Sequence, residues 1–303
     1  MEFKILNKLH ECRTVWNKLS SKKRLFDIWD YRICFFDREK QDFHFIVGEE
    51  KTKVAALVPL CFDKVKNKYS YFGGWFPERN TFFLKNREML PLLLEQCPYN
   101  TYIEGIDPAE ALYYKFSEDE FTYFLDLGKF NCNFEIYFST FNKKRQKNFK
   151  REMKSIPSYK LFHNRLDDIN RLVELNVRQY EEDSKLNDDA IKKGIYKLAE
   201  IAKKKHALEM LSLEINGQVE AVDIGILHRE WYYALIGGAN NLRYPNIGKL
   251  MTALDIKNAI KKKSRFIDFF ATSGHWKNMW NLEKQILLKF SKQNGNISRR
   301  IKI

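Results

Sequence analysis

Two carboxylates stand within segments that read as β-strands, and both are candidates for moving a proton. Asp223 shares a strand face with Val219, Ala221, Gly225 and Leu227, and Asp268 stands between Phe266 and Phe270. A carboxylate among apolar neighbours is costly unless it is paired or used in chemistry. We therefore expect Asp223 first, and Asp268 second, as a general base. A structural salt bridge is the alternative for each residue.

A basic segment further back offers a second candidate site. Residues 139–155 read as a helix that Ser139 or Thr140 can cap, and Arg145 and Asn148 fall on its apolar face with Phe141. An arginine on such a face must find a partner or line a cavity, so both residues are candidates either for substrate binding or for structural bracing. A separate stripe of cations is either a solvated face or a phosphate-binding surface: Lys143, Lys147, Lys150 and Lys154.

Two loops could complete a site. The segment RYPNIGK at 243–249 leads into a predicted helix, and the N–H groups at a helix start can bind phosphate. Arg243 and Lys249 would add positive charge there, beside Asn246 and Gly248. The second loop follows the Asp268 strand and could wall a substrate pocket with Gly274, Trp276 and Lys277, although packing is the commoner use of such a tryptophan.

The composition narrows the class of protein and of partner. The chain has 303 residues, 44% of them hydrophobic, so it can bury one large core or two cores of domain size. Its net charge of +14 suits an acidic partner such as RNA or a phosphorylated cofactor, with AT-rich codon usage as the alternative explanation. The five cysteines form no Cys-x-x-Cys pair and the six histidines are scattered, so we expect no metal.

The apolar runs also bear on where the protein acts. No run approaches the roughly 18 apolar residues that a membrane span requires, and the N-terminus lacks the apolar stretch of a secretory signal. We therefore expect a cytoplasmic protein without a membrane span.

The elements that would position these residues are fairly clear in the second half. Helices are expected at 168–180, 188–204 and 248–263, and strands at 211–215, 218–227, 231–236 and 265–270, with a tight turn at Asn216-Gly217 and a last hairpin around Asn294-Gly295. The first half repeats part of this pattern more weakly. A predicted hairpin at 43–47 and 53–62 leads to Gly73-Gly74, as the later strands lead to Gly237-Gly238. The sequence thus predicts two related halves, with a cleft between them as the place to look for function.

The order of these elements resembles the core of the GNAT acyltransferase superfamily, and in detail its double-domain FemAB-like and CelD-like acetyltransferases. The residues that carry the resemblance are the basic helix KKRQKNFKRE, the hairpin NGQVEA at 216–221, the loop PNIGKLM at 245–251, and Asp268-Phe269 followed by Gly274 to Lys277. VAALVPL at 54–60 and Gly73-Gly74 resemble the degenerate first domain of that branch.

The resemblance implies an α+β fold of two tandem GNAT-like domains, each a mixed, mostly antiparallel sheet flanked by helices. The domains would cover residues 1–135 and 136–303, the first shaping the acceptor pocket and the second binding the donor. The implied activity is N-acyl transfer, typically N-acetyl transfer, in which a small-molecule or peptide amine attacks the donor directly in the cleft. The implied donor is acetyl-CoA or another acyl-CoA, and no metal is implied. Backbone N–H groups of the long strand, including Ile224, Gly225 and Ile226, would orient the donor and stabilise the oxyanion.

Two alternatives stay open at the level of sequence. Some members of this branch use aminoacyl-tRNA as the donor, which would suit the basic charge of the chain. A non-catalytic binding protein on the same fold is the other alternative.

Overall fold

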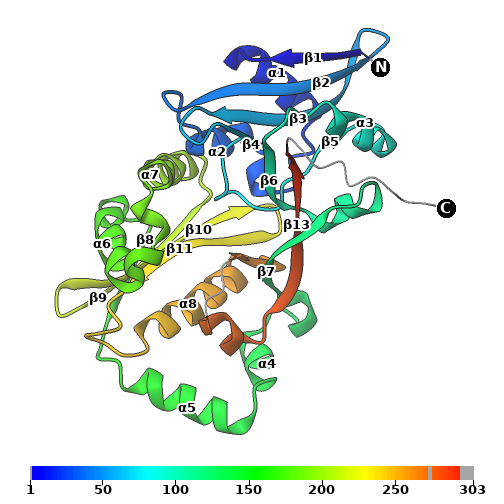
Figure 1. Cartoon of the computed structure of the whole chain (residues 1–303). Coiled ribbons are helices and arrows are strands. Elements are labelled where there is room, and N and C mark those ends of the chain that lie inside the picture. The colour runs from blue at the N-terminus through cyan, green and yellow to red at the C-terminus, as the bar shows by residue number, and fades with distance from the viewer. Residues whose placement is uncertain (1, 272–274, 294–303) are drawn as a thin grey trace. The chain divides into compact units, whose positions relative to one another are not determined.

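The computed structural model describes residues 2–271 and 275–293, which divide into two compact units (Figure 1). Among the described residues, the first unit comprises 2–120 together with 286–293, and the second comprises those between 121 and 285. The expected boundary at 135/136 therefore differs from this division in two respects. The division falls before the strand residues at 121–126, and most of the last described strand belongs to the first unit.

The first unit is built on a mixed sheet with the strand order β1-β2-β3-β4-β6-β13, and β5 pairs with β3. The pairing of β4 with β6 is parallel and the others are antiparallel. The strands are β1 (Glu2–Leu6), β2 (Gln41–Glu50), β3 (Lys53–Asp63), β4 (Lys68–Tyr71), β5 (Phe83–Leu84), β6 (Thr101–Ile106) and β13 (Glu283–Lys292).

An aromatic core holds the helices of this unit against its sheet. Trp16 is fully buried, and its ring meets those of Trp29, Phe45, Phe72 and Phe83. Such contacts add to the free energy gained from the area that these large rings bury. The helices are α1 (Leu9–Leu19), α2 (Trp29–Arg32) and α3 (Leu90–Glu95).

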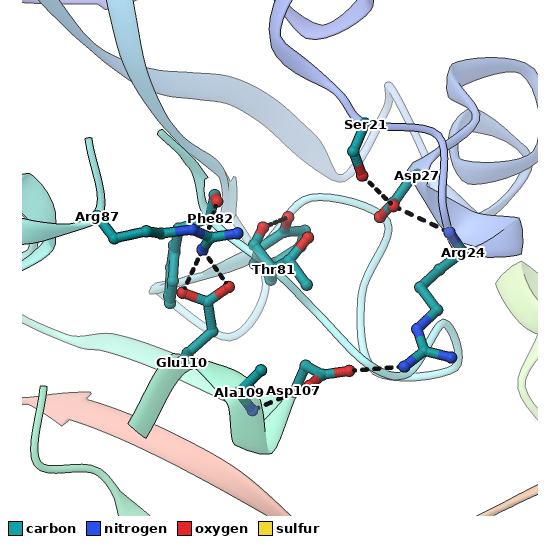
Figure 2. Close-up of polar contacts among 10 residues, drawn as sticks. Ser21, Arg24, Asp27, Thr81, Phe82, Arg87, Asp107, Ala109 and Glu110 are labelled. Carbon is teal, nitrogen blue, oxygen red and sulfur yellow. Dashed lines mark hydrogen bonds and ion pairs between the residues drawn. The ribbon is translucent and has the colours of Figure 1, made fainter. Parts of the chain in front are cut away.

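In the loops of the first unit, buried carboxylates are paired with partly exposed arginines (Figure 2). The buried carboxylate of Glu110 accepts two hydrogen bonds from Arg87 Nη1, at 2.5 and 2.7 Å. Arg24 Nη2 lies 3.4 Å from Asp107, whose carboxylate also caps the turn that begins at Ala109. Because buried charges are retained only when they are paired, these contacts fix the loops to the unit.

The strands of the second unit have the order β7-β12-β11-β10-β9-β8, with mixed pairing. Only β11 and β12 run parallel to each other; the other pairs are antiparallel. The strands are β7 (Ser117–Asp126), β8 (Lys160–His163), β9 (Leu208–Ile215), β10 (Gln218–His228), β11 (Trp231–Ala239) and β12 (Phe266–Ala271). The expectation of an α+β fold with mixed, mostly antiparallel strand pairing flanked by helices is confirmed.

Helices cover both faces of the strands of the second unit. A side chain at Gly238 would overlap with the backbone of α6, whereas the neighbouring Gly237 faces the side where Asp255 of α8 lies. Consecutive strand residues point to opposite faces, so α6 and α8 lie on opposite sides of β11. The helices are α4 (Phe134–Ser139), α5 (Lys143–Lys154), α6 (Ile169–Tyr180), α7 (Asp189–Lys204) and α8 (Ile247–Lys261).

Most expected elements of the second half form within a few residues of their predicted bounds, but the basic helix does not. The predicted helix 139–155 is interrupted at residues 140–142 and becomes α4 and α5. The cap of α5 is Asn142, whose Oδ1 accepts from the Arg145 N–H at 2.9 Å, and not Ser139 or Thr140. The expected hairpin turn at Asn294-Gly295 lies outside the described residues.

Candidate active site

The sheet of the second unit opens between its two parallel strands. The ladder between β11 and β12 covers Trp231 to Tyr233 on one side and Phe266 to Asp268 on the other. Farther along β11, side chains of α6 bind the strand edge instead. Asn176 Nδ2 donates to Gly237 O at 2.5 Å, and Gln179 Oε1 accepts from the Ala239 N–H at 3.0 Å. The N–H of Gly237 points to the same edge as its carbonyl, as the alternation of an antiparallel ladder requires.

Strand β10 cannot supply the backbone donors expected at Ile224, Gly225 and Ile226. All three residues pair with β9 on one edge and with β11 on the other, so their N–H groups belong to the interior of the sheet. Gly225 has a different use, because a side chain there would overlap with the ring of Tyr232. The open edge that could bind a donor is that of β11, one strand away from the expected place.

Asp223 projects from β10 toward this open edge. The residue is partly exposed and pairs with Gly237 across the ladder. A side chain on Gly237 would overlap with Asp223 Oδ1, so the carboxyl group lies directly over the glycine. The absence of a side chain at 237 therefore lets the Asp223 carboxyl reach across β11 toward the edge where the pairing with β12 has ended.

Asp223 is joined to a second carboxyl group that the sequence did not single out. Its carboxyl hydrogen-bonds to that of Asp255 on α8, and Tyr232 Oη donates to Asp255 Oδ1 at 2.7 Å. Burial, followed by the charge and hydrogen bond of Asp255, raises the pKa of Asp223 well above its usual range. Burial also raises the pKa of Asp255, to about 6, although the hydrogen bonds from Tyr232 and Asp223 oppose that rise.

Two further groups surround the carboxyl pair. Glu209 of β9 is buried, and it binds α8 through Lys262 Nζ at 2.6 Å and Asn258 Nδ2 at 3.1 Å. This anchors the C-terminal turns of α8, just beyond Asp255, to the sheet. Tyr180 ends α6, and its pKa is raised by burial and then by the charge of Asp223.

The residues expected on and after β12 have structural contacts. Asp268 is buried, and its Oδ1 accepts from the Phe270 N–H at 2.9 Å, where Phe270 has a left-handed φ of 59°. Lys277 is also buried, and its Nζ donates to the carbonyls of Phe269, Phe270 and Ala271 at 2.8, 2.7 and 3.2 Å. These contacts close the end of β12 and direct neither side chain toward solvent.

Of the other two residues predicted around that loop, only one is described. Trp276 is partly buried and packs edge-on against Phe269, with ring centroids 5.9 Å apart. Gly274 lies outside the described residues.

The residues expected to bind the phosphates of coenzyme A are engaged with other groups of the chain. Gly248 N–H donates to Asn241 Oδ1 at 3.2 Å, and Lys249 Nζ lies 2.5 Å from Glu152. Arg243 Nη1 donates to Gln218 and, at 2.8 Å, to the buried Glu220. Asn246 precedes α8 in a left-handed conformation, with φ of 72° and no side-chain cap. As they stand, these residues do not form a phosphate cradle.

A pocket of about 380 Å³ lies close to this loop, lined by Arg171, Gln218 and Val219. The guanidinium of Arg171 binds Val219 O at 2.9 Å and lies 3.7 Å from Glu220 Oε2. Glu220 thus stands between Arg171 and Arg243, and Arg171 is also paired with Glu174 at 2.9 Å, so the charges beside the pocket are balanced.

Arg145 and Asn148 were predicted from the basic helix, and the described contacts of Arg145 are with residues other than the carboxyl pair. The guanidinium of Arg145 stacks 4.4 Å over the Phe141 ring and donates to Asn281 Oδ1 at 3.3 Å. Its Nη2 is buried without a hydrogen-bond partner among the described residues, and burial lowers its pKa. Asn148 is partly buried on the same helix. These contacts agree with bracing of α5 against its neighbours.

The residues missed by the sequence reasoning are Asp255, Tyr232 and Gly237. Asp255 stands in the middle of the apolar residues of α8, which was a signal of the same kind as that of Asp223. Tyr232 and Gly237 gave no comparable signal, since a strand tyrosine and a strand glycine are ordinary until their neighbours are known. In the described residues, no group of three or more His, Cys, Asp or Glu side chains could hold a metal ion, and no helix is long and apolar enough to cross a membrane.

Comparisons with known proteins agree with this architecture. Residues 143–278 match the family model described as an acetyltransferase (GNAT) domain. No curated protein sequence matches the chain.

Several solved structures share the fold along nearly the whole chain. A conserved protein of unknown function from Bacteroides thetaiotaomicron is 15% identical, with a TM-score of 0.60 over 95% of this chain and 98% of that one. FemX is 12% identical, with a TM-score of 0.60 over 96% of each chain. A tandem GNAT protein from the clavulanic acid biosynthesis pathway is 9% identical, with a TM-score of 0.53 over 97% of this chain and 99% of that one. Residues 143–278 are thus a GNAT acetyltransferase domain by their family model, and the chain shares its fold with FemX and with a tandem GNAT protein.

Proposed function

We propose that this protein is an N-acyltransferase that works at the open edge of β11. The observation that supports this most is the Asp223 carboxyl group, which lies over Gly237 where the pairing between β11 and β12 has ended. A proton acceptor and an outward-pointing backbone N–H then lie on neighbouring strands. Acyl transfer to an amine needs both groups.

The proposed reaction is direct. The amine nitrogen forms a bond to the acyl carbonyl carbon, and the N–H of Gly237 stabilises the oxyanion that develops. The C–O or C–S bond to the donor then breaks. The proton released by the nitrogen passes to the carboxyl side chain of Asp223 and from there to the leaving oxygen or sulfur, so the enzyme returns to its starting protonation state.

An acyl-transfer assay tests this proposal. The purified chain is offered two donors, acetyl-CoA and a mixture of aminoacyl-tRNAs, each with amines that include lysine, glucosamine and a lysine-containing peptide. We expect transfer to at least one amine, and a loss of roughly 10²-fold or more in kcat for Asp223→Asn, the usual contribution of a general base.

Asp268→Asn is the matched control, because Asp268 is a strand carboxylate of the same unit that binds a backbone N–H within its own strand. Transfer that survives Asp223→Asn at the wild-type rate would refute the assignment of the base. A chain that transfers nothing from either donor to any of the amines would favour a non-catalytic binding protein.

For the donor, the structure supports aminoacyl-tRNA over acyl-CoA. The residues expected at the coenzyme A phosphates are already engaged, as described above. Helix α5, by contrast, buries none of its residues fully and displays a row of exposed cations: Lys143, Lys144, Lys147, Lys150, Arg151 and Lys154. Its single acidic residue, Glu152, is paired with Lys249. Such a helix suits the repeated phosphates of an RNA backbone.

Charge reversal on α5 tests this choice, with α7 as the control. Lys143, Lys147 and Lys154 on α5 have the same spacing as the exposed lysines Lys193, Lys197 and Lys204 on α7. Changing the first three to Glu should weaken tRNA binding and reduce the slope of log K against log salt by roughly 2. The same changes on α7 should have little effect.

The two donors predict different outcomes in a binding experiment. Salt-insensitive tRNA binding, or equal effects of the α5 and α7 variants, would remove the support for tRNA. A rise in melting temperature with acetyl-CoA, together with transfer from it, would establish acyl-CoA as the donor instead.

A further inference from the structure

The carboxyl groups of Asp223 and Asp255 are too close to be treated separately. A hydrogen bond between two carboxyl groups requires a proton on one of them, and the structure joins these two side chains by such a bond. Asp255 is 4% exposed, whereas Asp223 is partly exposed, so only Asp223 of the two can meet a substrate. Asp255 stands behind it on α8.

Tyr232 makes the environments of the two carboxyl groups unequal. Its hydroxyl group is fully buried and donates to Asp255 Oδ1 at 2.7 Å, but it makes no corresponding bond to Asp223 in the described structure. A hydrogen bond donated to a carboxyl group stabilises its ionised form. The shared proton is therefore held by Asp223 and the negative charge by Asp255.

Two glycines make room for this arrangement. A side chain at Gly237 would overlap with the Asp223 carboxyl, and one at Gly225 would overlap with the Tyr232 ring. Both positions are in strand interiors, where glycine is unfavourable without a reason. The close approach of Asp223 and of Tyr232 supplies that reason at each position.

We propose that Asp223 and Asp255 act as one acid pair that holds a single proton. In this pair, Asp255 and Tyr232 are positioning residues, which keep the proton on Asp223. The catalytic use of the pair rests on the proposed acyl transfer, whereas the existence of the pair does not. The amine proton binds to Asp223 while the proton of Asp223 moves to Asp255. The pair then holds two protons, and it gives one of them to the leaving group.

The groups around the pair leave it with one net negative charge. From β9, Glu209 faces α8, but its carboxylate is bound by Lys262 and Asn258. From β11 comes Tyr232, and from α6 comes Tyr180, which is neutral because burial raises its pKa further. No cation other than Lys262 has a contact to these groups in the described part of the chain, so the pair must accept and release protons by itself.

An infrared experiment on the whole chain without any substrate tests whether the pair exists. Protonated carboxyl groups have a carbonyl absorption that carboxylates lack, and it is followed from pH 5 to pH 9. We expect part of this band to persist at pH 8 in the wild type and to be lost in Asp223→Asn. Asp255→Asn should move the midpoint of the Asp223 band to lower pH, because the charge and hydrogen bond that hold the proton on Asp223 are gone.

Difference spectra against matched variants make the assignment specific. Burial also raises the pKa of Asp27, Glu104 and Glu110 in the first unit, so only the change caused by each substitution is interpreted. Asp268→Asn serves as the control and should leave the pH 8 band unchanged. A pH 8 band that is absent in the wild type, or that Asp223→Asn does not diminish, would overturn the proposal.

The kinetic part of the test separates this inference from the proposed function. With the donor and amine found in the transfer assay, kcat should fall at acidic pH as the pair takes up its second proton. Tyr232→Phe should move that limb to higher pH, and the Asp223→Asn/Asp255→Asn double variant should be no slower than Asp223→Asn alone. A pH limb that Tyr232→Phe does not move would contradict the pair. If the band is present but no acyl transfer is found, the proposed function fails and the pair stands.

Discussion

At the scale of single residues, the site depends on two glycines as much as on its carboxyl groups. Gly237 and Gly225 provide the space that the Asp223 carboxyl and the Tyr232 ring fill. A strand loses stability when it carries glycine, so the fold accepts a local cost at both positions. The result is a carboxyl pair in a sheet interior, covered by α8 and open toward one strand edge.

The pair should also leave a signature in the pH dependence of stability. Asp255 has a pKa of about 6 in the folded chain, above its usual value, so folding favours its protonated form. The stability that this gives is fully present below about pH 4 and is lost as the pH rises through about 6. The size of the loss is on the order of 3 kcal/mol.

Asp255→Asn should therefore gain stability relative to the wild type between pH 4 and pH 7, as measured by urea unfolding at each pH. Tyr232→Phe is the companion variant. It removes a hydrogen bond that holds the Asp255 pKa down, so it should move the pH window upward. Parallel stability curves for Asp255→Asn and the wild type would contradict this account.

At the scale of elements, β12 is held at its end by a buried lysine. The three carbonyls of Phe269, Phe270 and Ala271 converge on Lys277 Nζ, beside a residue whose φ is left-handed. This arrangement keeps the end of β12 fixed without a neighbouring strand partner on the β11 side. We infer that Lys277 contributes to the shape of the opening between the two strands, and not to substrate binding.

Lys277→Met should show which of these roles is right. The substitution keeps most of the side-chain length but removes the ammonium group, so the buried carbonyls lose their donor. We expect a loss of about 2–4 kcal/mol in the free energy of unfolding, measured with denaturant. Lys261→Met, at an exposed position in the last turn of α8, should cost less than about 0.5 kcal/mol. Unchanged stability with an increased KM would instead support substrate binding by Lys277.

At the scale of the whole molecule, the chain crosses back to complete its first unit. Strand β13 pairs with β6, and Leu288 and Phe290 join the aromatic core of that unit. The last described strand is therefore part of a unit whose other strands all lie within the first 120 residues or so of the chain.

A pair of truncations tests this dependence. A chain that ends at Gln285 lacks β13, so β6 is left as an open edge and the core loses two large apolar side chains. Hydrogen exchange should show lost protection in β2 and β3, while β10 keeps its protection. A chain that ends after residue 293 retains β13 and is the control. Equal protection of β2 in both chains would show that β13 is dispensable.

Local sequence determined most of the secondary structure of the second unit. Helices α6, α7 and α8 and strands β9, β10 and β11 were predicted because apolar periodicity and the Asn216-Gly217 turn act over short distances. The break between α4 and α5 was not predicted. Thr140 and Phe141 are as compatible with a helix as with a break, and the choice was made by the Asn142 cap and by packing of Phe141 against Trp280.

For the site, the sequence by itself identified Asp223 as a carboxylate that needed an explanation, because its apolar neighbours in the strand are visible in one dimension. Only the tertiary structure showed the explanation, since Asp255, Tyr232 and Gly237 come from α8 and β11 and meet Asp223 through strand register and helix packing. The same holds for Asp268 and Lys277, whose partners are backbone groups of β12. Composition and periodicity determine which elements form. The partners of a buried polar group depend on how those elements pack, and the linear sequence does not contain that distance information.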